Sequence, residues 1–137
     1  MSYEILLVPI IAMIAAQAIK VFIDAIKGEP ILKDLNRYGG MPSGHSALVG
    51  ALAMEVGMAE GFSSSLFAVA FVLMFLIVRD AVGLRNRLGK HGKVLNMVIK
   101  DLPKNKNKYP ELEQRLGHTP AQVIVGLLLG IAVAIML

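Results

Sequence analysis

The sequence contains no cysteine and few charged residues. Of its 137 residues, 18% are charged and 55% are hydrophobic, whereas soluble proteins average roughly 25% charged and 45–50% apolar residues. The absence of cysteine excludes a disulfide framework and thiolate chemistry. The histidines show no metal-ligand spacing such as H-x-x-x-H, and we expect neither a metal nor a cofactor. The first residues lack the basic segment of a signal peptide, so we expect the first apolar run to be retained.

The apolar residues gather in four stretches. A chain this short cannot bury so much apolar surface in a soluble fold, and helices satisfy the backbone hydrogen bonds of a segment in lipid. We therefore predict an all-α integral membrane helical bundle, a single domain over residues 1–137 with about four transmembrane helices. The predicted spans are residues 5–26, 42–58, 66–82 and 119–137. The second is the weakest, because it is short and contains Glu55.

Residues 83–117 form a long basic connector. Its first part repeats apolar residues at helical spacing among basic ones, a pattern typical of an amphipathic helix that lies in the membrane interface. In the last span, Gly126 and Gly130 form a G-x-x-x-G. This motif either lets two helices approach closely or reflects only how common glycine is in membrane helices.

The basic residues predict the orientation. With four spans, both termini and the turn at 59–65 share one side, which holds Glu4 and Glu60 and no Lys or Arg. The two longer connectors carry twelve of the 14 basic residues, and Lys and Arg in short loops favour the cytoplasm. We predict a cell-membrane protein with both termini outside and the connectors in the cytoplasm. Since this bias explains the basic charge, no nucleic-acid partner is expected.

The same topology brings three polar features to the cytoplasmic face. Pro-Ser-Gly-His-Ser at 42–46 opens the second span, Arg-Asp at 79–80 ends the third, and Gly-His-Thr-Pro at 117–120 opens the fourth. Helix N-termini favour phosphate, and two histidines can supply an acid and a nucleophile. The candidate residues are His118, His45 and Asp80 for catalysis, and Lys20, Ser43, Gly44, Arg79, Arg85 and Gln122 for binding.

Each feature also has a structural explanation. A histidine near the interface can be a hydrated helix cap, Arg79 and Asp80 can pair with each other, and His91 fits an exposed surface position. Either Asp80 or Asp34 could orient an imidazole. Glu55 could be a functional intramembrane carboxylate or lie near the opposite headgroups.

The motif Gly-Gly-Met-Pro-Ser-Gly-His-Ser-Ala-Leu-Val at 39–49 resembles the divergent branch of the type 2 phosphatidic acid phosphatase superfamily, which includes the vanadium-dependent haloperoxidases. Further matches in the right order cover nearly the whole chain. They are Ala16-Gln17-x-x-Lys20, Arg79-Asp80-Ala-x-Gly83-x-Arg85, Gly89, Leu95-Asn96, and Leu-Gly-His-Thr-Pro-x-Gln-Val-x-x-Gly at 116–126.

The resemblance implies metal-independent chemistry in which one histidine forms a phosphohistidine and another protonates the leaving oxygen. By motif, His118 would be the nucleophile and His45 the general acid. Ser43 and Gly44 would donate hydrogen bonds, and Lys20 would contact phosphate. The chain departs from the superfamily pattern in three ways: no Arg-Pro follows the lysine, no Ser-Arg precedes His118 at the expected distance, with Arg115 nearby instead, and the usual acid is replaced by Gln122.

The leading hypothesis is therefore a membrane-embedded phosphatase or phosphotransferase that acts on a lipid phosphate at the cytoplasmic leaflet. Four spans instead of the usual six leave the site less enclosed, so a homodimer could complete it. One alternative is a catalytically degenerate membrane protein that still binds the anion or lipid phosphate. Another is a small transporter subunit, which depends mainly on Glu55.

Overall fold

The computed structural model describes residues 3–28, 40–102, 109–114 and 116–137. The predictions that concern Asp34, Arg115 and most of the first connector lie outside these residues, and so does the polar stretch at 103–108.

The described residues form helices and no strand, which confirms the predicted all-α class. Four helices make the bundle and correspond to the four predicted spans, with ends that differ by one or two residues. The fifth, α5, lies in the basic connector. The helices are α1 (Glu4–Ile26), α3 (Gly44–Glu60), α4 (Ser65–Val82), α5 (Leu84–Asp101) and α6 (Pro120–Met136).

Helix α3 lies at the centre of the bundle and packs against α1, α4 and α6. Its inward positions are small residues such as Ala47 and Ala51, which join Ala12 and Ala16 of α1 in the core. Because α3 is surrounded by protein, it needs less apolar side-chain surface than a helix that faces lipid. This explains why its sequence was the weakest of the four spans and how it can hold Glu55, which is 8% exposed.

Helices α3 and α6 approach each other through the G-x-x-x-G of α6. A Cβ added to Gly126 would collide with the backbone of Ser43, and one added to Gly130 would overlap the carbonyl oxygen of Ala47. A Cβ on Gly50 of α3 would in turn crowd the backbone of Leu127. The glycines are therefore packing residues that set the distance between the two helices.

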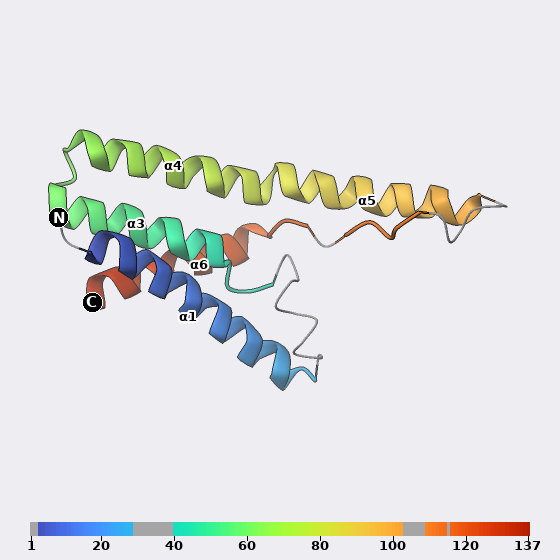
Figure 1. Cartoon of the computed structure of the whole chain (residues 1–137), viewed down its shortest axis with the longest axis horizontal. Helices are drawn as coiled ribbons and strands as arrows, with labels where there is room; N and C mark the ends of the chain where they lie inside the picture. The colour runs from blue at the N-terminus through green and yellow to red at the C-terminus, as the bar shows by residue number, and fades with distance from the viewer. Residues whose placement is uncertain (1–2, 29–39, 103–108, 115) are drawn as a thin grey trace.

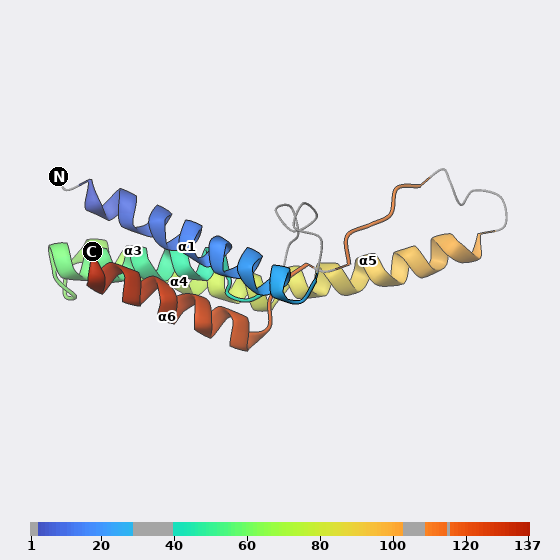
Figure 2. The same cartoon turned by 90° about the horizontal axis from the view of Figure 1, so that it is seen from below.

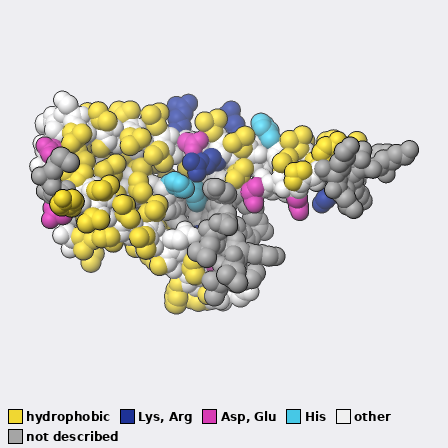
Figure 3. Space-filling model, in the orientation of Figure 1, with side chains coloured by type: hydrophobic (Ala, Val, Ile, Leu, Met, Phe, Trp, Pro, Cys, Tyr) yellow, Lys and Arg dark blue, Asp and Glu magenta, His cyan; other side chains and the backbone are white. Residues whose placement is uncertain are grey.

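The outer surface of the bundle is apolar. Large side chains of α1, α4 and α6 point outward, among them Leu6, Phe22, Phe71, Leu76 and Leu128. Figure 3 shows the hydrophobic side chains over the bundle and a band of charged and histidine side chains beside them. Helix α1 and the run from Ser65 to Asp101 are long and apolar enough to cross a membrane, and α6 is a shorter apolar helix. The molecule is a membrane helical bundle.

Helix α5 continues along the line of α4 and extends beyond the bundle (Figures 1 and 2). Only Gly83 separates the two helices, and its N–H still donates to the carbonyl oxygen of Arg79 at 2.8 Å. The residues of the predicted amphipathic pattern lie on one helix, and both its apolar and its basic side chains are exposed, among them Leu84, Leu88 and Lys90. The residues it buries are Gly89, Gly92 and Asn96.

The chain direction places four helix ends on the same side of the bundle. Both chain termini lie at one end of the bundle, here called the terminal end (Figure 1). The N-terminal ends of α3 and α6 and the C-terminal ends of α1 and α4 lie at the other end, here called the site end (Figures 1 and 2). Three polar features distant in sequence therefore meet there.

Candidate functional site

The N-termini of α3 and α6 lie side by side at the site end. The backbone N–H of Ser43 donates to the carbonyl oxygen of Gln122 at 3.2 Å, and Gly126 allows the close approach. The Ser43 hydroxyl caps α3 by accepting from the N–H of Ser46 at 3.4 Å and from its hydroxyl at 2.9 Å. Ser43 and Ser46 are fully buried, so Ser43 acts here as a cap, and its side chain does not face solvent.

Capping leaves a defined set of donors for an anion. In α3 the N–H of Ser46 bonds to the Ser43 hydroxyl and that of Ala47 to the Ser43 carbonyl. Since the first four N–H groups of a helix have no partner within it, the backbone N–H groups of Gly44 and His45 are left without a partner among the residues that the structure describes. Packing alone does not require glycine at position 44, because a Cβ there would make an ordinary contact with Met13.

His118 is held by the first turn of α6. Thr119 and Gln122 form a capping box, in which the Gln122 side-chain oxygen accepts from the Thr119 N–H at 3.0 Å. That bond identifies the amide atom as Oε1, and the same oxygen lies 3.3 Å from His118 Nδ1. Because Oε1 is only an acceptor, this bond favours a proton on Nδ1. In the neutral imidazole, Nε2 is left with its lone pair.

The surroundings of His118 favour that neutral form. Partial burial lowers the pKa of His118, and the charges of His45 and Lys20 lower it further, while hydrogen bonds to Gln122 and to the backbone of Gly40 raise it. The net effect is a pKa below the usual value of a histidine. His118 is therefore available as a nucleophile or base at neutral pH, and Gly40, Lys20 and His45 are its neighbours.

Lys20 is the buried cation of the site. Its side chain is 5% exposed, and its methylene groups lie against Gly40, where an added Cβ would come within 2.7 Å of Cε. Gly40 also has φ = 97°, a backbone conformation that suits glycine. A buried cation beside His118 attracts an anion to the imidazole face of the site.

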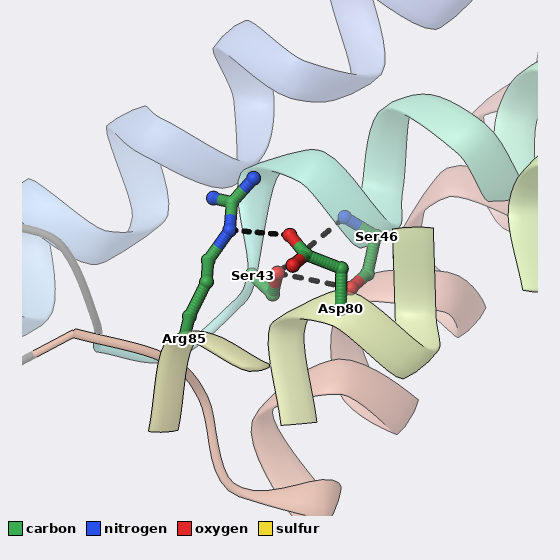
Figure 4. Close-up of polar contacts among 4 residues, drawn as sticks. All are labelled: Ser43, Ser46, Asp80 and Arg85. Atoms are coloured by element: carbon green, nitrogen blue, oxygen red, sulfur yellow. Dashed lines mark hydrogen bonds and ion pairs between the residues drawn. The ribbon is translucent and has the colours of Figure 1, made fainter. Parts of the chain in front are cut away.

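Asp80 and Arg85 form an ion pair across the junction of α4 and α5. Arg85 Nε donates to Asp80 Oδ2 at 2.6 Å, and Figure 4 shows the pair beside Ser43 and Ser46 at the start of α3. Among the described residues, the hydrogen bond of Asp80 goes to Arg85 and not to an imidazole. The bond uses Nε, so the two terminal amino groups of Arg85 can still meet an oxyanion.

His45 is coupled electrostatically both to the Asp80–Arg85 pair and to His118. It is exposed in the first turn of α3. The charges of Asp80 and Arg85 act on it, and its own charge acts on His118. The residues that meet at the site end, here called the histidine cluster, are Lys20, His45, Asp80, Arg85, His118 and Gln122.

Two of the residues weighed from the sequence lie apart from the histidine cluster. Arg79 is exposed, and its side chain forms no hydrogen bond or ion pair with any residue that the structure describes. Glu55 is buried within electrostatic reach of Glu4, at the terminal end. The described part of the chain contains no group of three or more His, Asp or Glu residues arranged to hold a metal ion.

Sequence reasoning missed the backbone groups of the site. The Gly40 backbone bonds to His118, and the His118 N–H donates to the carbonyl oxygen of Ala81 at 3.0 Å. Ala81 lies in the last turn of α4, where carbonyls lack helical partners. The lack of helical partners for these carbonyls predicts that some other group will donate to Ala81, but it does not say which segment supplies the donor.

Comparison with known proteins agrees with this architecture. The model of the Divergent PAP2 family matches residues 1–133. An uncharacterized membrane protein of Bacillus subtilis (strain 168), YuiD, is 38% identical over 145 residues, which cover 96% of this chain and 92% of the relative. No solved structure matches the chain significantly. The family match spans the histidine cluster, helices α1 to α5 and α6 as far as residue 133, and the chain belongs to the Divergent PAP2 family.

Proposed function

We propose that the chain is a metal-independent phosphatase or phosphotransferase that acts on a lipid phosphate, with His118 as nucleophile and His45 as general acid. The observation that carries the proposal is the bond between His118 Nδ1 and Gln122 Oε1, at 3.3 Å. It leaves Nε2 unprotonated in the neutral imidazole, beside the buried Lys20.

The electrostatics of the site suit a phosphoryl group. Lys20, the terminal amino groups of Arg85 and the N–H groups of Gly44 and His45 are donors from three different elements. Phosphoryl transfer depends chiefly on positioning and on stabilising the charge of the phosphoryl oxygens. These donors can do both without a metal.

The proposed reaction has two steps. Nε2 of His118 attacks phosphorus, the bond from phosphorus to the leaving oxygen breaks, and His45 gives that oxygen a proton. In the second step water attacks the phosphohistidine, the phosphorus–nitrogen bond breaks, and His45 recovers a proton from the water. If an alcohol replaces water, the same steps transfer the phosphoryl group.

The position of the site supports a lipid substrate. The histidine cluster lies where the apolar outer surface of the bundle ends. Phe22, two residues after Lys20, and Leu84, next to Arg85, have exposed apolar side chains. A phosphate attached to an acyl chain could place its chain along the bundle and its headgroup at the site. By the distribution of basic residues, the site faces the cytoplasm.

The test is phosphate release by purified protein in detergent, with phosphatidic acid as substrate. His118→Ala and His45→Ala should each abolish release, because each removes a reacting group. His91→Ala is the matched control, since His91 is exposed on α5 outside the histidine cluster, and it should keep the wild-type rate. Equal rates in all four proteins would contradict the proposal.

One observation favours a second function, that of a binding protein without turnover. Gln122 is neutral, and an amide stabilises the imidazolium that forms during catalysis less well than a carboxylate. Saturable vanadate binding that is lost in Lys20→Met, without phosphate release by the wild-type protein, would favour this alternative.

The orientation can be tested separately, because the chain has no cysteine. Single cysteines at Lys90 and Glu60 in intact cells should differ in their reaction with a membrane-impermeant maleimide. The proposal predicts labelling of Glu60→Cys from outside and protection of Lys90→Cys until the cells are permeabilised. The reverse pattern would turn the site to the outer face.

A further inference from the structure

Helix α5 carries a buried polar and glycine face that the proposed chemistry does not use. Asn96 is 5% exposed, although it lies on a helix that extends beyond the bundle (Figure 1). Gly89 and Gly92 are buried on the same face. What covers this face is the segment that returns to α6, residues 109–114 and 116–118.

Asn96 holds that segment by two hydrogen bonds. Its side-chain amide donates to the carbonyl oxygen of Leu112 at 2.8 Å, and its side-chain oxygen accepts from the Leu112 N–H at 3.0 Å. One side chain thus satisfies both backbone groups of one residue, as a neighbouring strand would do. A side-chain amide is suited to this geometry, because it carries a donor and an acceptor on neighbouring atoms without a change of charge.

The two glycines let the returning segment lie directly on the helix. A Cβ added to Gly92 would come within 2.7 Å of the carbonyl oxygen of Glu113. One added to Gly89 would come within 2.7 Å of the carbonyl oxygen of Gln114 and within 3.1 Å of that of Leu116. Real Cβ atoms do not approach backbone oxygen this closely, so any side chain at these positions would displace the segment.

The far end of the segment is His118. Gly117, with φ = 93°, packs against the first turn of α5, and the His118 N–H bonds to Ala81 at 3.0 Å. From Leu112 to His118 there are six residue steps, which span at most about 20 Å when fully extended. From Asn96 back to Ala81 there are fifteen helical steps, or about 22 Å. The segment is therefore comparable in length to the stretch of α4 and α5 along which it runs.

We infer that Asn96, with Gly89 and Gly92, is a positioning device for His118: it fixes the register of the returning segment and through it the imidazole. We call residues 112–114 and 116–118 the strap. Because the strap is short, release at Leu112 frees Gly117 and His118 to move away from Ala81 and Gln122. The inference extends the proposed function, in which His118 is the nucleophile, but its structural part can be tested without any activity.

The test uses the three histidines of the chain. Protein with ¹⁵N-labelled histidine in detergent micelles gives imidazole signals that single substitutions assign to His45, His91 and His118. In wild type, the His118 signals should show the Nδ1–H tautomer. Asn96→Ala should move His118 toward a mixture of tautomers, leave His91 unchanged, and speed hydrogen exchange at the Leu112 amide.

Met97→Ala is the control, because Met97 follows Asn96 on the same helix and its side chain is exposed. It should leave the His118 signals and the Leu112 exchange as in wild type. Gly89→Ala displaces the strap by a different route and should reproduce the Asn96→Ala spectrum, so it decides the matter if Asn96→Ala does not fold. In a phosphatase assay, Asn96→Ala and Gly89→Ala should each lower kcat by about 10- to 100-fold and change KM less, because a misplaced nucleophile slows the reaction more than it weakens substrate binding.

Two results would overturn the inference. If Leu112 exchanges faster in Asn96→Ala while the His118 tautomer stays as in wild type, the strap does not position His118. If Leu112 exchange does not change, Asn96 does not hold the strap. Absence of phosphatase activity in the wild-type protein would contradict the proposed function alone, because the tautomer and exchange measurements do not depend on turnover.

Discussion

The two ends of the bundle use the same local structures and carry different chemistry. At the terminal end, α4 starts with the Ser64 hydroxyl accepting from the Phe67 N–H at 3.1 Å, and the ionisable neighbours are acidic, as Glu4 and Glu60 illustrate. At the site end, α3 starts with the equivalent cap at Ser43, but a second N-terminus, a buried lysine and two histidines lie beside it. A capped helix start therefore does not make a site by itself; the convergence of four helix ends does.

The bundle middle couples the two ends, and the largest effect is expected there. Gly130→Val should destabilise the fold by about 1–3 kcal/mol or more, because the added carbons overlap the Ala47 backbone. The same variant should also lose vanadate binding, since α3 and α6 can no longer meet. Ala132→Val, at an exposed position of the same helix, is the control. Unfolding in mixed micelles measures the difference, and equal stability of the two variants would contradict the packing account.

Arg85 tests whether the site end owes its anion affinity to a specific side chain or to general basic charge. Arg85→Gln should weaken vanadate binding about 10- to 100-fold, the range expected for hydrogen bonds to a charged group. Arg87→Gln removes the same charge from an exposed position of α5 and should change affinity little. Calorimetry of both variants makes the comparison, and equal losses would mean that only the net charge matters.

Gln122 tests the tautomer and protonation of His118. The pKa of His118 is lowered, so its neutral form persists below about pH 6.5, which is the usual pKa of a histidine. Any activity should therefore decline only at lower pH. Gln122→Glu places a carboxylate beside Nδ1, favours the imidazolium, and should move this acid limb upward by roughly one pH unit. Rates measured between pH 4.5 and 8 would show the shift, and an unmoved limb would separate Gln122 from the reacting histidine.

The two serine caps should give the smallest effect and the sharpest comparison of the ends. Ser43→Ala and Ser64→Ala should each cost about 1 kcal/mol of stability, because each removes an N-cap. Only Ser43→Ala should also weaken vanadate binding, since the N–H groups of Gly44 and His45 follow the cap. Similar losses of binding in both variants would indicate a general loss of folding and not a local role.

Much of this architecture could be predicted from hydrophobic pattern and charge. The four spans follow from length and composition, and their alternating direction brings His45, Asp80 and His118 to one end. That Arg85 and not Arg79 pairs with Asp80 could not be predicted, because it depends on how α4 and α5 are rotated against each other and against α3, and successive residues on a helix differ by about 100° in direction.

The strap could not be predicted from the sequence either. Residues 109–118 have no periodic sequence pattern, and the backbone groups of Leu112 and His118 bond to the Asn96 side chain and to a helix end. The resemblance to the superfamily includes Gly89 and Asn96, but it does not indicate which residues they contact. The partner is the backbone of a segment sixteen residues away, and its own side chains need not be distinctive for Asn96 to bind it.

The most direct measurement is a structure of the protein with bound vanadate in lipid nanodiscs. The account predicts vanadium within bonding distance of His118 Nε2, with its oxygens contacted by Lys20, Arg85 and the first turn of α3. A vanadate that lies at the terminal end, or on the basic surface of α5 away from His118, would contradict it.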